Sequence, residues 1–177
     1  MNDFTTTFTV PQSPDTVFDA INDVRAWWGG HIEGDTDKLG DVFVYEHLPE
    51  HRSVQRITES TPGTRIVWHI DEAHLSFVDD GDEWTDTEVV FDLEPADGGT
   101  RVTFTHRGLV PEFECYDACS SAWSMYINGA LRQFIEGRGT APSLASRFRT
   151  NEALAQRLHC PESPRGRRAP ENTELSE

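Results

Sequence analysis

The chain has 177 residues, of which 36% are hydrophobic, and its 10 Phe and 5 Trp can supply one core of ordinary size. Its 31 acidic residues exceed its 15 basic residues, and the formal net charge of -16 repels phosphate backbones and anionic lipid headgroups. No stretch reaches the roughly 18 apolar residues of a membrane span, and the N-terminus lacks the regions of a signal peptide. We therefore expect a cytoplasmic protein whose partner is neither a nucleic acid nor a membrane.

The N-terminal segment predicts one strand followed by two short helices. Residues 4–10 alternate in polarity, with Phe4, Phe8 and Val10 on one face, as in a half-buried strand. Ser13 then precedes Pro14, which is the pattern of a hydroxyl N-cap with proline at the first helical position. A second short helix is expected at 23–28, where two glycines end it.

Five further strands are expected in the middle of the chain, because β-branched and aromatic runs alternate there with turn-rich stretches. Their ranges are 41–47, 51–59, 64–71, 86–94 and 99–107. The last two are separated only by a glycine-containing turn, so they predict a hairpin.

A long helix is predicted at 116–136, since apolar residues recur there at steps of three and four. Residues 143–158 could form another amphipathic helix, whereas the polar, proline-rich segment from 161 onward predicts a disordered tail. Acids dominate residues 1–138 but are nearly balanced by bases in residues 139–177. We therefore divide the chain into a domain, residues 1–138, and a C-terminal extension, residues 139–177.

The order of these elements resembles the helix-grip architecture of the START-like superfamily. Three segments are similar to the branch related to the activator of the heat-shock-protein ATPase: residues 4–28 with the Trp27 and Trp28 pair, residues 99–109, and residues 123–131. The resemblance covers residues 3–138. It implies an α+β fold in which a curved antiparallel sheet, with two short helices after its first strand, wraps around the long C-terminal helix. It also implies a cavity between sheet and helix, without specifying a ligand.

If the sheet curves around the helix, a largely aromatic set of side chains faces inward. We predict that this set binds a small hydrophobic molecule: Phe43, Tyr45, His47, Trp68, Phe91, Phe104, His106, Trp123, Ile127, Ala130 and Phe134. The alternative is that the rings fill the space themselves, because protein interiors are normally close-packed. Gly129, in the middle of the helix, is interpreted as a site of close packing on another element, or as a residue that shapes the cavity.

Metal and cofactor sites are not expected. The spacing of His47 with His51, and of Cys115 with Cys119, lacks the second ligand pair of a structural zinc site. The acidic run at 79–83 lacks the alternating ligands of a calcium loop, so it predicts a solvated turn.

The three cysteines, Cys115, Cys119 and Cys160, predict reduced thiols, because their number is odd and no export signal precedes them. Inward-facing histidines, His47 and His106, could orient a polar ligand group or act as general bases.

Three functions remain open, and the sequence favours the first. It is a non-enzymatic protein that binds or carries a small hydrophobic molecule. The second is an enzyme of the cyclase or aromatase type, in which His47, Tyr45 or His106 moves protons. The third is a stress-related or co-chaperone-like module that binds a protein partner through its acidic surface and its arginine-rich tail.

Overall fold

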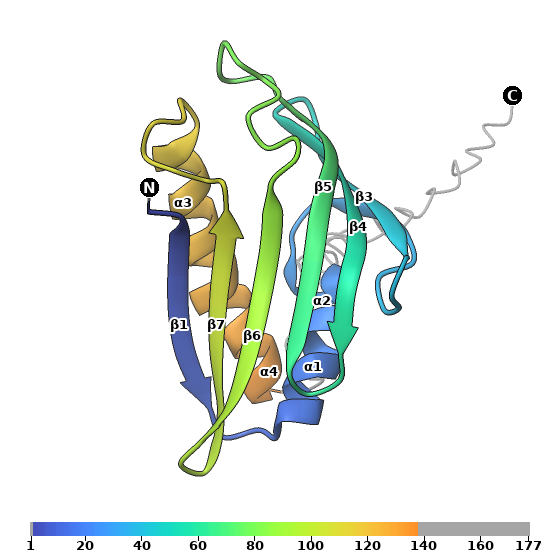
Figure 1. The fold of residues 1–177 in the computed structure, drawn as a ribbon, viewed down its shortest axis with the longest axis vertical. Coiled ribbons are helices and arrows are strands. Elements are labelled where there is room, and N and C mark those ends of the chain that lie inside the picture. Colours follow the sequence, from blue (N-terminus) through green and yellow to red (C-terminus); the bar gives the residue numbers. More distant parts are fainter. Residues whose placement is uncertain (1, 138–177) are drawn as a thin grey trace, which may run out of the picture. The chain divides into compact units, whose positions relative to one another are not determined.

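A computed structural model of the protein describes residues 2–137, which form an antiparallel sheet with helices on one of its faces (Figure 1). The seven strands are arranged in the order β1-β7-β6-β5-β4-β3-β2. Their bounds are β1 (Phe4–Val10), β2 (His31–Gly34), β3 (Val42–His47), β4 (His51–Thr61), β5 (Arg65–Leu75), β6 (Glu88–Ala96) and β7 (Gly99–Arg107). Strands β2 to β7 follow one another as a meander, and the N-terminal strand β1 completes the sheet by pairing with β7.

The first helices are short and begin where the sequence predicts. In α1 (Pro14–Asn22), the hydroxyl oxygen of Ser13 accepts a hydrogen bond from the Thr16 amide at 3.3 Å, and Pro14 occupies the first turn. The helix buries one apolar face through Val17 and Ile21. After α1, the single turn α2 (Val24–Trp27) places the Trp27 and Trp28 pair against the sheet.

The C-terminal helix has three consecutive parts: α3 (Tyr116–Met125), the π-helical segment η1 (Tyr126–Leu131) and α4 (Arg132–Gly137). One apolar stripe runs along all of it, with Trp123, Ile127, Leu131 and Ile135 buried. A Cβ atom added at Gly129 would meet nothing within 4 Å. The interpretation of Gly129 as a close-packing site is therefore wrong, because no neighbouring element within residues 2–137 approaches it.

The sheet is irregular in β4, where the register with β5 shifts between Val54 and Gln55 and again between Ile57 and Glu59. Such bulges bend a strand and increase its twist. The sheet can therefore curve around the helical layer.

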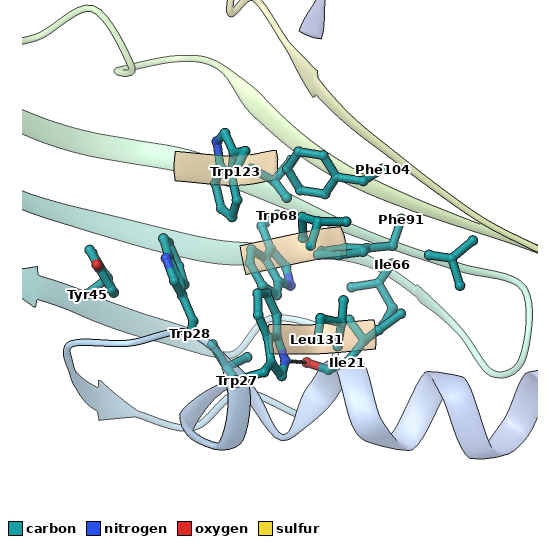
Figure 2. Packing of buried hydrophobic residues seen from close by; sticks show 14 of the residues in the cluster. Ile21, Trp27, Trp28, Tyr45, Ile66, Trp68, Phe91, Phe104, Trp123 and Leu131 are labelled. Atoms are coloured by element: carbon teal, nitrogen blue, oxygen red, sulfur yellow. Dashed lines mark hydrogen bonds between the residues drawn. The ribbon is translucent and has the colours of Figure 1, made fainter. Parts of the chain in front are cut away.

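The interior next to α1 is solidly packed (Figure 2). Trp27 stacks on Trp68 with ring centroids 6.3 Å apart, and its indole N–H donates to the Ile21 carbonyl at 3.1 Å. Phe43 and Phe91 meet Trp68 edge-on, each with its ring centroid at 5.1 Å. At this level of the sheet, the aromatic rings fill the space between the layers.

The predicted fold class is confirmed: the chain is an α+β protein whose curved antiparallel sheet holds a long C-terminal helix, with two short helices after the first strand. Strand β2 was not predicted, because only Ile32 of its four residues is buried and no alternation marks it. The predicted helix at 143–158, the tail and the extension from 139 onward lie outside the described residues.

Candidate functional site

A cavity of about 330 Å³ lies where the end of the sheet formed by β3 and β4 meets α3. Four structural segments besides Trp28 contribute its walls: the β3–β4 region, the β5–β6 loop, α3 and the start of η1. The lining residues are Trp28, Tyr45, His47, Glu50, His51, Phe77, Trp84, Ala118, Cys119, Ala122, Trp123, Met125 and Tyr126.

Aromatic rings form the deep wall of this cavity. Trp28 and Tyr45 stack with centroids 4.0 Å apart and ring planes within 8° of parallel, and Figure 2 shows these two rings side by side. Trp123 lies 5.1 Å from Trp28, and Trp84 stacks on Trp123 at 5.7 Å. These four side chains are each less than 5% exposed, so the wall is rigid and apolar.

Two tyrosine hydroxyls converge at one side of the cavity. Both Tyr45 and Tyr126 donate to the carbonyl oxygen of Gly29, at 2.7 and 3.4 Å respectively. Burial, followed by the influence of Tyr126, raises the pKa of Tyr45 well above its usual value. Tyr45 is therefore a neutral phenol at neutral pH.

The His51 imidazole lies between aromatic neighbours, with its ring edge-on to Tyr45 at 5.0 Å and to Trp84 at 4.6 Å. Its Nε2 atom is buried and has no hydrogen-bond partner among residues 2–137. Burial, with a smaller contribution from His47, lowers the pKa of His51 to about 4. His51 is thus a neutral ring with one uncommitted nitrogen beside the cavity.

His106 lies behind the cavity wall and both its ring nitrogens are hydrogen-bonded. The Trp123 indole N–H donates to Nδ1 at 3.0 Å, so Nδ1 is the unprotonated nitrogen. Nε2 therefore carries the proton and donates to the Thr87 hydroxyl at 2.8 Å, and that hydroxyl donates to the Trp84 carbonyl. Burial lowers the pKa of His106 to about 3, so this chain of hydrogen bonds holds a neutral structural histidine.

The β5–β6 loop is tied to the start of α3. The Glu83 carboxylate accepts hydrogen bonds from the backbone amides of Glu114 at 2.6 Å and Cys115 at 2.9 Å. The Asp79 amide in turn donates to the Glu114 carboxylate at 2.8 Å. The prediction of a purely solvated acidic turn is therefore wrong for Glu83, which binds two backbone amides immediately before α3 and so ties the loop of Trp84 to this helix.

Three of the sequence-predicted site residues line the cavity: Tyr45, His47 and Trp123. Six others are fully buried in the packed interior: Phe43, Trp68, Phe91, Phe104, His106 and Ile127. Ala130 and Phe134 are partly buried against the same core. Alternation assigned the strand residues of this set to the face of the sheet that meets the helices, but it could not locate the cavity along the strands.

Several lining residues were absent from the predicted set. Trp28 and Tyr126 belonged to segments already recognised, the tryptophan pair and the helical stripe, so they were within reach of sequence reasoning. Phe77 and Trp84 come from a loop with no periodic pattern, and Glu50 from a turn. Only the tertiary structure shows that these three residues line the cavity.

Cys115 and Cys119 are buried free thiols, and Cys119 lines the cavity. The hydrogen bond with Cys119, together with burial, raises the pKa of Cys115 far above that of an exposed thiol. Cys160 lies outside the described residues. Within residues 2–137, no group of three or more His, Cys, Asp or Glu side chains is placed to hold a metal ion. No helix in the same range is both long and apolar enough to cross a bilayer.

The curved sheet, the helical layer on one face and the cavity between them define a START-like helix-grip protein. The chain belongs to the family described as activator of Hsp90 ATPase homolog 1-like protein, whose model matches residues 11–136. None of the curated proteins matches the sequence significantly.

Solved structures share this fold at low sequence identity. The Aha1 dimer from Colwellia psychrerythraea is 20% identical, with a TM-score of 0.64 over 78% of this chain and 100% of that chain. Protein MLL2253 from Mesorhizobium loti is 15% identical, with a TM-score of 0.63 over 79% and 100% respectively. DynU16, from the dynemicin biosynthetic locus, is 16% identical, with a TM-score of 0.58 over 77% of this chain and 48% of that chain. At these identities the likeness shows the fold alone.

Proposed function

We propose that the protein binds a small hydrophobic molecule in this cavity and acts as a binding or carrier protein rather than as an enzyme. The observation that carries the proposal is the composition of the lining, in which six aromatic side chains surround a space of about 330 Å³. Small-molecule sites are typically concave and mostly apolar, with few polar groups to set orientation.

The proposed driving force for binding is the burial of apolar ligand surface. A guest that hides roughly 200 Å² of apolar surface gains about 5 kcal/mol from burial, before the cost of association is subtracted. The stacked Trp28 and Tyr45 rings are already fixed by the protein, so binding requires little ordering of this wall.

A thermal-shift and tryptophan-fluorescence screen with neutral apolar compounds tests the proposal. Three indoles, Trp28, Trp84 and Trp123, line the cavity and should report occupancy. A ligand at about 100 times its dissociation constant adds about 2.7 kcal/mol to the stability. If no compound of a broad library changes the melting temperature or the tryptophan fluorescence, the proposal is wrong.

A cavity-filling variant provides the matched control. Ala122→Trp places an indole in the lining, whereas Ser121→Trp adds the same group to an exposed neighbouring position of α3 that is not part of the lining. We expect Ala122→Trp to abolish binding and Ser121→Trp to leave it unchanged. Equal binding by the two variants would place the ligand elsewhere.

A second candidate function, a cyclase or aromatase type of reaction, is favoured by one observation: the unpartnered Nε2 of the neutral His51 beside the cavity. Such a nitrogen can accept a proton from a bound substrate. The test is cyclisation of a polyketone probe by the protein and by His51→Asn. Loss of turnover with retained binding would support this function, whereas equal turnover by both proteins would exclude His51 as its base.

A further inference from the structure

We propose that the ligand of this cavity is an organic cation, a quaternary or protonated amine attached to an apolar group. The inference rests on the proposed function, because it specifies the chemical class of the molecule that the cavity binds.

The lining combines aromatic rings with a single carboxylate. Its aromatic members come from five segments: Trp28, Tyr45, Phe77, Trp84, Trp123 and Tyr126. Glu50 is the one acidic residue in the lining, and no Lys or Arg of residues 2–137 contributes to it. Aromatic faces attract alkylammonium groups, and they do so more strongly when water is excluded.

The carboxylate is available for a ligand. Glu50 is exposed beside His51, and within residues 2–137 its carboxylate forms no ion pair with a basic side chain. Its backbone carbonyl accepts a hydrogen bond from Ser76 at 3.0 Å, which fixes the β3–β4 turn against the β5–β6 loop. The Glu50 side chain is therefore presented at the cavity by an anchored backbone.

The loop that supplies two of the lining rings is acidic as well. The β5–β6 loop that supplies Phe77 and Trp84 also carries Asp79, Asp80 and Asp82, all of them exposed. A concave site with negative charge at its rim concentrates cations and repels anions. Together with Glu50, these carboxylates disfavour an anionic ligand.

Three polar donors of the wall already have acceptors within the protein, whereas the buried indole N–H of Trp84 has none among residues 2–137. The hydroxyls of Tyr45 and Tyr126 donate to the Gly29 carbonyl, and the Trp123 indole donates to His106. The buried His51 ring stays neutral, since burial lowers its pKa to about 4. These groups consequently offer no positive charge to an anion, and a quaternary ammonium needs no hydrogen-bond donor.

The experiment compares two ligands of the same shape, 4-hydroxyphenyltrimethylammonium and 4-tert-butylphenol, by isothermal titration calorimetry at an ionic strength of about 0.15 M. They differ only in the charged nitrogen that replaces a carbon. We expect the cation to bind roughly tenfold more tightly, which is the range of a desolvated cation–aromatic contact. Equal or tighter binding of 4-tert-butylphenol would overturn the inference.

Three variants test which residues cause the preference for the cation over the phenol. Glu50→Gln and Phe77→Leu should each reduce the preference for the cation several-fold and change binding of the phenol little. Because Phe77 is 47% exposed, its replacement leaves the core intact. Glu94→Gln removes a carboxylate on β6 at the opposite end of the sheet and should change neither affinity. An equal loss in Glu94→Gln and Glu50→Gln would mean that the cation binds to the acidic surface, which contradicts the inference.

The two proposals fail in different ways. If neither compound binds while neutral apolar ligands do, the cation preference is wrong and the hydrophobic cavity stands. If neither compound binds and the neutral screen is also silent, both proposals are wrong.

Discussion

The carboxylate of Glu83 should contribute about 2 kcal/mol to the free energy of unfolding. It accepts hydrogen bonds from the Glu114 and Cys115 amides at the beginning of α3, and the side chain is only half-buried. Hydrogen bonds to a charged group contribute about 1.5 kcal/mol or more each, and the partial exposure of Glu83 reduces the sum of two. Glu83→Ala removes both bonds and leaves the two amides immediately before α3 without this acceptor.

Urea denaturation followed by circular dichroism gives the free energy of unfolding. The matched control is Asp82→Ala, which removes an exposed carboxylate from the neighbouring position and should cost less than about 0.5 kcal/mol. Glu83→Ala should also weaken ligand binding, because the anchored loop carries Trp84. If Glu83→Ala is no less stable than Asp82→Ala, the assigned tether between the loop and α3 is wrong.

Three further outcomes are expected. Gly129→Ala should raise the free energy of unfolding by about 0.5–1 kcal/mol, because the added Cβ meets nothing within 4 Å, and an unchanged melting curve would contradict this. Thr87→Val should cost about 1–3 kcal/mol in urea denaturation, since it leaves the N–H of His106 unpaired; a neutral effect would refute the hydrogen-bond chain. In the native state the pKa of His51 is lowered to about 4 and that of His106 to about 3. Below about pH 6.5 the unfolded chain therefore binds protons that the native state does not, and the free energy of unfolding should fall as the pH drops. The dependence of the urea midpoint on pH between 6.5 and 5 should be shallower in His51→Asn, and an identical dependence would contradict the lowered pKa.

Local patterns were sufficient for most of the fold. Alternation marked β1 and the β6–β7 hairpin, the Ser13 and Pro14 pair marked the start of α1, and the apolar stripe marked the C-terminal helix. Each of these signals is confined to residues close together in the chain. The π-helical segment η1 and the bulges of β4 left no such signal, because they depend on how neighbouring elements pack.

The site was less accessible to sequence reasoning than the fold. A period of two separates the faces of a strand but gives no position along it, so Phe91 and Phe104 were grouped with Tyr45 although they lie in the solid part of the core. Trp84 lies on a loop that Glu83 ties to α3 through a contact between residues about 30 positions apart. Long-range contacts of this kind are not encoded in local periodicity.

The pairing of β1 with β7 delays completion of the sheet during synthesis. The hydroxyl of Thr5 donates to the Phe104 carbonyl across 99 positions of sequence, and no earlier strand offers β1 a partner. At about 5–20 residues per second, the ribosome needs roughly 5–20 s to produce the missing neighbour after β1 has emerged. During that interval Phe8 and Val10 lack the β7 residues with which they pair in the folded sheet, so the first strand of the nascent chain stays unpaired.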